Sequence, residues 1–267
     1  MNTIRVCIAG ATGWAGSALS LGVYQCENMK LVSAISRRHS GQNLADVLNF
    51  GKSHIPIFDN VGAALEIGCD VFVEYTKPDV AKSNVLTALR KGLNVVIGTS
   101  GLTSQDYSEI EKAACENDSS VLAVGNFALT AVLLQKFSEI AARYIPNFEV
   151  IDFAHEDKID SPSGTARELA DRLSKVQSPN VFVSEKDLIG VKESRGAEMN
   201  GIQVHSVRLP GYVISIESIF GLKDEKLSIR HDAGSGAEPY VKGALLAIEK
   251  VKTFKGLRRG LDSVMDF

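Results

Sequence analysis

The stretch IRVCIAGATGWAGSALSL, residues 4–21, decides the fold. A short apolar run leads directly into Gly10, Gly13 and Gly16, and a helix-like sequence follows. Glycines at such points let a strand turn tightly into a helix and let backbone N–H groups approach a pyrophosphate. The spacing G-x-x-G-x-x-G could also form an ordinary turn, but its place between a strand and a helix favours a dinucleotide site. We predict that the cofactor lies along Gly10, Ala11, Thr12, Gly13, Trp14 and Ala15.

The end of the second predicted strand indicates which dinucleotide is bound. An NAD site usually places Asp or Glu there, roughly 20 residues past the glycine turn, to bind the ribose hydroxyls. This chain instead has Ser36-Arg37-Arg38. A hydroxyl followed by guanidinium groups suits a 2′-phosphate, which arginine binds bidentately, although a solvated basic turn is the alternative. We predict that Ser36 and Arg37 contact the cofactor, and that NADPH is preferred while NADH is possible.

Beyond this turn, β-branched runs alternate with helical patterns as far as residue 127. Such alternation is typical of a parallel sheet with crossover helices. One helix is expected to begin near Pro78 and end before Gly92, and another to cover about 104–115. We therefore expect residues 1–127 to form a Rossmann-type, dinucleotide-binding domain. Its predicted strands are Ile4–Ala9, Leu31–Ser36, Cys69–Tyr75, Asn94–Thr99 and Ser120–Val124.

The pattern changes after residue 127. A longer amphipathic helix at about 130–144 is followed by a strand, a helix and then three strands in direct succession, which predicts an antiparallel or mixed sheet. The fold class expected is thus α/β, with a second α+β domain, residues 128–237, built on a mixed open sheet that carries the substrate. A helical tail at about 238–267 is expected to complete the first domain. The predicted strands are Phe148–Phe153, Ile202–Arg208, Tyr212–Phe220 and Lys226–His231.

Composition limits the classes of partner. The 267 residues carry 29 Lys plus Arg against 32 Asp plus Glu, a net charge of −3, so there is no basic field to attract nucleic acid or an anionic membrane. No apolar run approaches the ~18 residues of a membrane helix, and the first residues lack a signal-peptide pattern. We expect a cytoplasmic protein with a small-molecule substrate. Neither a metal site nor a redox motif is predicted, because no C-x-x-C pair occurs among Cys7, Cys26, Cys69 and Cys115.

A polar loop in the second domain carries candidate chemistry. Residues 150–167 read VIDFAHEDKIDSPSGTAR, the end of a strand, a loop and the start of a helix. Reduction of a C=N bond needs a cationic donor for the charge that hydride addition creates and an anion clamp that orients the substrate. Lys158 could supply the first. The second could come from the hydroxyl-rich helix start at Ser163, Gly164 and Thr165. A surface ion pair and a simple helix cap are the alternatives.

This loop resembles that of the dihydrodipicolinate (4-hydroxy-tetrahydrodipicolinate) reductase family of bacterial lysine biosynthesis. The family's loop has the form H-H-x-x-K-x-D-x-P-S-G-T-A, which matches here from His155 through Lys158 and Asp160 to Ala166. Similarity covers nearly the whole chain. It includes the glycine turn and the segments YTKP at 75–78, VIGTS at 96–100, GNF at 125–127 and HSVR at 205–208.

The resemblance implies an NAD(P)H-dependent reductase of a cyclic imine or enamine in the lysine and diaminopimelate pathway. It implies a homotetramer assembled through the sheet of the second domain. It makes Lys158 the proton donor and His155 a second catalytic candidate, with His155, Gly164 and Thr165 at the substrate carboxylates. It also adds to the cofactor site Gly98, Thr99, Ser100, Val124, Gly125, Asn126 and Phe127.

Several positions depart from the family's pattern. The first loop histidine falls on Ala154 in an ungapped alignment, whereas a loop one residue shorter would give that position to His155. A Gly-Glu-His stretch becomes residues 214–216, ISI, and a substrate-facing Ser-Ser-Arg becomes GSG or SGA within residues 234–237, without the arginine. Glu156 and Asp157 also make the loop more acidic. These changes are expected to disfavour a dianionic substrate.

Three alternatives therefore stand beside the family's own activity. A diverged paralogue would reduce a different, less anionic imine. A non-catalytic protein would bind NADPH without turnover. A semialdehyde dehydrogenase is a third reading, because GATG at 10–13 also resembles that family's opening, but its chemistry needs an activated cysteine between the domains. Cys115 falls in a helical pattern and the other cysteines precede it.

Overall fold

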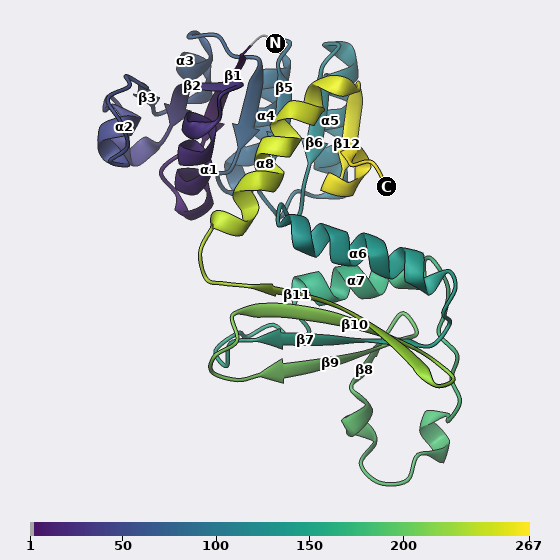
Figure 1. Ribbon diagram of the computed structural model, residues 1–267. Helices are drawn as coiled ribbons and strands as arrows, with labels where there is room; N and C mark the ends of the chain where they lie inside the picture. Colours follow the sequence, from purple (N-terminus) through teal and green to yellow (C-terminus); the bar gives the residue numbers. More distant parts are fainter. Residues whose placement is uncertain (1–2) are drawn as a thin grey trace. The chain divides into compact units, whose positions relative to one another are not determined.

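The computed structural model describes residues 3–267, which form two compact units (Figure 1). The first unit contains the chain through Leu129 together with Ala237–Phe267. The second unit is the continuous segment Thr130–Gly236. The first unit is thus discontinuous in sequence, because the chain returns to it after the second unit is complete.

A seven-stranded sheet forms the centre of the first unit, and all of its strand pairs are parallel. The order β12-β6-β5-β4-β1-β2-β3 reverses direction at β1, which lies between β2 and β4. In sheets of this kind ligands bind beyond the carboxyl ends of the strands at that reversal. The strands are β1 (Ile4–Ala9), β2 (Met29–Ile35), β3 (Ile57–Phe58), β4 (Val71–Glu74), β5 (Asn94–Ile97), β6 (Ser120–Ala123) and β12 (Gly256–Arg259).

Helices cover both faces of this sheet. On one face α1 packs beside α8, and on the other α3, α4 and α5 form a row (Figure 1). Strands buried on both faces have near-continuous apolar sequences, as the burial of β1 and β4 illustrates. The predicted Rossmann-type sheet is therefore confirmed. The helices are α1 (Trp14–Gln25), α2 (Leu44–Val47), α3 (Val61–Leu65), α4 (Pro78–Leu89), α5 (Ser104–Glu116) and α8 (Glu238–Lys250).

The second unit has a five-stranded mixed sheet of order β11-β10-β7-β9-β8. The pair β7 and β9 is parallel, and the other pairs are antiparallel. Two helices, α6 (Leu129–Ala142) and α7 (Gly164–Ser174), cover one face, where they share an apolar core with the sheet. The predicted mixed sheet is confirmed. Its strands are β7 (Phe148–Ala154), β8 (Ala197–Met199), β9 (Ile202–Arg208), β10 (Ile214–Leu222) and β11 (Glu225–Ala233).

Burial alternates along β7, which fixes the two faces of the second sheet. Phe148, Val150, Asp152 and Ala154 are buried, and the residues between them are half-buried. Side chains alternate sides in a strand, so the buried set faces the helices. In the part of the chain that the structure describes, no helix combines the length and the apolar character needed to cross a bilayer.

Candidate functional site

The glycine turn follows β1 at the carboxyl edge of the first sheet. Gly10 has a φ of +79°, and a Cβ there would collide with the carbonyl oxygen of Tyr75. A Cβ on Gly16, in the first turn of α1, would collide with the carbonyl of Gly10. The turn closes through a 2.9 Å hydrogen bond from the Gly13 N–H to the Gly10 carbonyl. The sequence therefore needs glycine here for both backbone conformation and close packing.

The N-terminus of α1 is open to an anion. Its N-cap is Gly13, which has no side chain to accept a hydrogen bond from the first turn, and that turn contains no acidic residue. The first N–H groups of a helix lack partners within the helix and carry partial positive charge. A pyrophosphate would satisfy both conditions, so the residues present fit a dinucleotide.

Ser36 and Arg37 lie just beyond the carboxyl end of β2. The hydroxyls of Thr12 and Ser36 are 2.7 Å apart, which joins the glycine turn to this second strand end. Arg37 and Arg38 are exposed on a short 3₁₀ turn, Arg37–His39. Neither forms an ion pair within the described residues 3–267, so both guanidinium groups remain available to a phosphate.

The remaining predicted cofactor residues follow β5 and β6 on the same edge. Gly98 lies against the rings of Tyr75 and Phe127, whose centroids are 5.5 Å apart, and leaves no space for a Cβ. Val124 donates to the carbonyl of Ile97 (2.9 Å), which continues the pairing past the strand. Three of these residues are buried, namely Thr99, Val124 and Phe127. Ser100 and Gly125 are exposed, and Asn126 is half-buried. The structure thus brings all predicted cofactor residues to one edge of one sheet.

Sequence reasoning missed Glu74, a fully buried carboxylate at the end of β4. It accepts hydrogen bonds from the N–H (2.7 Å) and hydroxyl of Thr76, the side-chain amide of Asn84 (2.9 Å) and the hydroxyl of Thr99 (3.3 Å). Burial raises the pKa of Glu74, and these hydrogen bonds oppose the rise. Glu74 thereby joins the loops after β4 and β5. The available signal was a single acidic residue closing an apolar strand.

The second candidate site begins where β7 ends. Ser163 is the N-cap of α7, and its Oγ accepts a hydrogen bond from the Ala166 N–H (3.3 Å). Ser163 is buried, Thr165 is half-buried and Gly164 is exposed, and no acidic residue lies in the first turn. The N-terminus of a helix carries partial positive charge, so the first turn of α7, at Gly164 and Thr165, favours a carboxylate.

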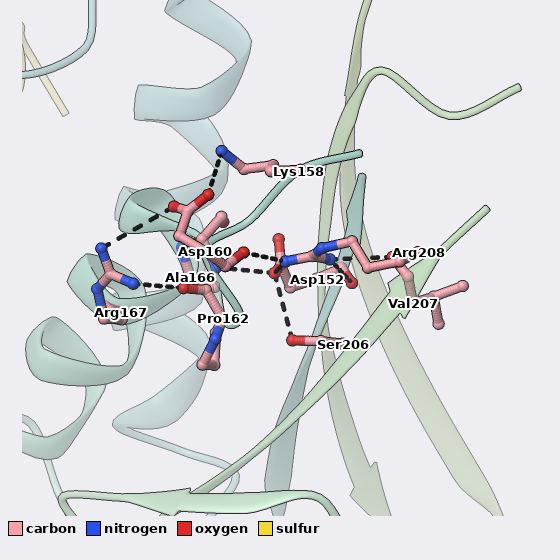
Figure 2. Close-up of polar contacts among 10 residues, drawn as sticks. Asp152, Lys158, Asp160, Pro162, Ala166, Arg167, Ser206, Val207 and Arg208 are labelled. Atoms are coloured by element: carbon pink, nitrogen blue, oxygen red, sulfur yellow. Dashed lines mark hydrogen bonds and ion pairs between the residues drawn. The ribbon is translucent and has the colours of Figure 1, made fainter. Parts of the chain in front are cut away.

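Lys158 lies in the loop between β7 and this turn (Figure 2). Its Nζ is 2.7 Å from Asp160 Oδ1, and this contact lowers the pKa of the Asp160 carboxyl. His155 is exposed at the start of the loop, where its Nδ1 is 2.6 Å from Asp157 Oδ1. The predicted residues therefore share one loop and one helix start, with two acidic neighbours close to the cationic groups.

Two of the positions that depart from the family's pattern lie in the interior of the second unit. Ala154, the last residue of β7, is 1% exposed and faces the helices, whereas His155 begins the exposed loop. Ile216 is also 1% exposed and belongs to the apolar core of the unit. Where the family's Gly-Glu-His stretch has its histidine, this chain thus has an isoleucine, Ile216, that packs in the core.

The sequence predicts no role for two further residues, one in segment 150–167 and one in segment 205–208. Asp152 and Arg208 form a 2.7 Å ion pair on the buried face of the second sheet. The signal that could have found them is a charged residue at an inward-facing position of an alternating strand.

Two family models cover nearly the whole chain. The model described as "Dihydrodipicolinate reductase, N-terminus" matches residues 4–127, and "Dihydrodipicolinate reductase, C-terminus" matches residues 130–265. The 4-hydroxy-tetrahydrodipicolinate reductase of Geobacillus kaustophilus is 36% identical over 265 residues, covering 99% of this chain and 100% of the relative. That of Bacillus cytotoxicus is 34% identical over 267 residues, with complete coverage of both chains.

Solved structures agree. Dipicolinate-bound dihydrodipicolinate reductase from Paenisporosarcina sp. TG-14 superposes with a TM-score of 0.89 at 32% identity, covering 98% of this chain and 100% of that one. Amine dehydrogenase from Mycobacterium smegmatis shares the fold, with a TM-score of 0.70 at 14% identity over 98% and 96% of the two chains. The resemblance read from the sequence motifs is confirmed, and the chain belongs to the dihydrodipicolinate reductase family.

Proposed function

We propose that this protein is an NAD(P)H-dependent reductase of 4-hydroxy-tetrahydrodipicolinate in lysine and diaminopimelate biosynthesis. The observation that carries the proposal is the loop after β7, where the ammonium of Lys158 and the carboxylate-accepting turn at Ser163 belong to one short segment. The substrate is a dicarboxylate, and a relative of 32% identity was solved with dipicolinate, a dicarboxylate too.

The chain's own residues orient the substrate and deliver a proton. The N–H groups at Gly164 and Thr165, with His155, hold the substrate carboxylates. Lys158 holds a proton at Nζ and donates it to the negative charge that hydride addition leaves on the conjugated imine. NAD(P)H, when bound, supplies the hydride. Asp160 keeps the Lys158 ammonium oriented through its 2.7 Å contact.

The cofactor would be held by the first unit. The glycine turn and the open N-terminus of α1 suit the pyrophosphate, and the loops after β5 and β6 complete the site. We assign NADPH as the preferred form, because Ser36 and Arg37 occupy the strand end where an NAD site carries an acidic residue.

We further propose that the second unit binds the substrate and forms a homotetramer through its sheet. The face of β7 away from the helices exposes part of Ile151 and Phe153. A hollow of about 830 Å³ on this unit is lined by both polar and apolar residues. Three apolar residues that line it, Val181, Phe182 and Val183, are strongly exposed, and a cluster of exposed apolar side chains is typical of an interaction surface. We place the enzyme in the cytoplasm, which fractionation of cells would test.

The deciding experiment follows NADPH absorbance with the purified protein and substrate made in situ by its synthase. Rapid, substrate-dependent oxidation is expected. If oxidation is absent while NADPH binding is measured on the same sample, the proposed substrate is wrong, and a panel of other cyclic imines would identify a diverged paralogue. Binding of NADPH with no turnover on any imine would instead indicate a non-catalytic protein.

The semialdehyde dehydrogenase alternative has less support. Cys115 lies near the end of α5, and Cys7 is buried in the first sheet. Covalent catalysis on a semialdehyde would need one of the cysteines to act as nucleophile. Only a loss of activity after treatment with iodoacetamide, which alkylates cysteine, would support the semialdehyde dehydrogenase alternative.

A further inference from the structure

Asp152 places a carboxylate on the buried face of β7, directly beneath the loop that carries Lys158. Its side chain is 1% exposed. The Oδ2 atom accepts a 2.8 Å hydrogen bond from the N–H of Ser163, the cap of α7, and a weaker one of 3.4 Å from the hydroxyl of Ser206. A buried carboxylate needs such partners, because leaving it unpaired is strongly unfavourable. Asp152 therefore fixes the position of the carboxylate-accepting turn.

Arg208 completes the arrangement from the neighbouring strand. In the parallel pairing of β7 with β9 it lies opposite Ala154, at the end of both strands. Its Nη2 donates to Asp152 Oδ2 (2.7 Å) and to the backbone carbonyl of Asp160 (2.8 Å), as Figure 2 shows. Its Nη1 donates to the carbonyl of Val207 (3.0 Å). One guanidinium thus joins two strands to the loop.

The loop is consequently held at two points on either side of Pro162. Arg208 holds the carbonyl of Asp160, and Asp152 holds the N–H of Ser163. The carboxylate of the same Asp160 contacts Lys158. The same buried ion pair therefore fixes the positions of both the proton donor and the carboxylate-accepting turn.

The geometry requires an arginine. The contacts use two guanidinium nitrogens held in one plane: Nη2 donates to the Asp152 carboxylate and the Asp160 carbonyl, while Nη1 donates to the Val207 carbonyl. The single nitrogen of an ammonium cannot occupy both positions. Within the described residues Arg208 Nε is buried without a hydrogen-bond partner, so the side chain is placed for its Nη contacts and leaves one donor unsatisfied. Buried ion pairs contribute little net stability, so we infer that the role of this pair is to place the loop.

We propose that Asp152 and Arg208 are a positioning pair that sets Lys158 relative to the carboxylate-accepting turn. This inference rests on the proposed function, since it assumes that Lys158 donates a proton to a substrate held at Ser163–Thr165. Both residues of the pair act through the loop.

The test is a double-mutant cycle of Arg208→Lys with Lys158→Ala, measured as kcat/KM for the imine made in situ. Arg208→Lys is expected to lower kcat/KM by about 10²-fold, the usual cost of a misplaced catalytic group, with little change in NADPH affinity. In the Arg208→Lys background, Lys158→Ala should cost less than about tenfold, because the ammonium is already out of place. If the double variant loses kcat/KM by the full product of the two single-variant losses, the residues act independently and the proposal is overturned.

Arg172→Met is the matched control. Arg172 is 20% exposed, close to the 16% of Arg208, and its guanidinium contacts Glu139 and Glu168 on the helical side of the same unit. Its loss should lower stability without changing kcat/KM more than about twofold. An equal loss of kcat/KM in both variants would mean that Arg208 acts only through general stability.

A readout independent of turnover separates this inference from the proposed function. Arg208→Lys, and Asp152→Asn as a second variant, should raise hydrogen exchange at the Ser163 amide by about tenfold over wild type, while Arg172→Met should not. If wild type fails to reduce the imine but exchange behaves in this way, the proposed substrate is wrong, while the role of Asp152 and Arg208 as the loop anchor, the pair that holds the loop, is supported. Unchanged exchange in both variants would overturn the anchor even in an active enzyme.

Discussion

Lys158 occupies a half-buried position in the β7–α7 loop with an acidic partner at 2.7 Å. Lys158→Ala should leave NADPH affinity almost unchanged and lower turnover by roughly 10²-fold or more, the scale of losing a general acid. Steady-state kinetics and fluorescence titration with NADPH would check both parts. Lys175→Ala, which breaks a surface pair with Asp171 on α7, is the control and should be neutral. Undiminished turnover in Lys158→Ala would remove this residue from the mechanism.

Arg37 is the residue on which the choice of cofactor rests. Arg37→Ala should reduce the ratio of kcat/KM for NADPH over NADH by roughly 10- to 100-fold, the range for one charge-assisted contact. Arg90→Ala, another exposed arginine of the first unit, should leave the ratio unchanged. A ratio that survives Arg37→Ala would refute the assignment of a 2′-phosphate site.

Glu74 should make stability fall as the pH rises. Burial raises its pKa above 4.5, so the folded chain holds this proton more tightly than the unfolded chain does. The stability it contributes is therefore present below pH 4.5 and is lost as the pH rises through the raised value. The difference in free energy of unfolding between wild type and Glu74→Gln should decline over that range in urea titrations.

Glu66→Gln gives a control of opposite sign. The contact with Lys91 lowers the pKa of Glu66, so its contribution is present above pH 4.5 and lost as the pH falls through the lowered value. A flat difference for Glu74→Gln across pH 4.5 to 8 would contradict the raised pKa.

At the scale of elements, α5 begins with a reciprocal cap. The Thr103 hydroxyl accepts from the Asp106 N–H (3.2 Å), and Asp106 Oδ2 accepts from the Thr103 N–H (2.8 Å). Thr103→Ala should destabilise the first unit by about 1 kcal/mol at neutral pH, which thermal unfolding would measure. Ser108→Ala, within the same helix, is the matched control. No loss of stability in Thr103→Ala would show that the cap contributes nothing.

The acidic half of this cap gives it a pH dependence. Hydrogen bonds from Thr103 lower the pKa of Asp106 from 3.8 to about 2. The stabilisation is therefore complete above pH 3.8 and is lost as the pH falls through about 2. The destabilisation caused by Asp106→Asn should shrink over the same interval.

Elements with strong local signals could be predicted from the sequence. The predicted strand Ile4–Ala9 matches β1, and a strand beginning at Phe148 matches β7 to within one residue. Elements that depend on distant partners could not. The two-residue strand β3 and the three-residue strand β8 are too brief for a periodic pattern, and β12 reads GLRR, which is not a buried apolar run. These strands exist because a neighbouring edge offers pairing. Nor does the sequence order show that β7 lies between β9 and β10.

The same division applies to the candidate sites. Glycine, arginine and lysine positions were found because the turn, the strand end and the loop are contiguous motifs. Asp152 and Arg208 were missed because they are far apart in sequence, so that only the folded register brings them together. Glu74 was missed because its contacts with Asn84 and Thr99 form only when α4 and the loop after β5 pack against β4. The role of a single buried charged residue can be inferred only when the residues that contact it are known.

At the scale of the whole molecule, the proposed tetramer makes a direct prediction. Phe182 is 82% exposed beside the hollow on the second unit. Phe182→Asp should lower the mass measured by light scattering below that of four chains, because a carboxylate cannot be buried unpaired in an apolar interface. Ile67→Asp, on the first unit, should leave the mass unchanged. A wild-type monomer would exclude the tetramer outright.

The discontinuity of the first unit has a consequence for synthesis on the ribosome. Strand β6 lies at the edge of the first sheet until β12 pairs with it, and the ribosome must translate the entire second unit before β12 emerges. The second unit is continuous and can fold while the chain is still growing. The nascent first sheet meanwhile presents an unpaired edge, the feature that templates association with other chains. Transcripts truncated within α8 should therefore yield a protein with a folded second unit and an aggregation-prone first one.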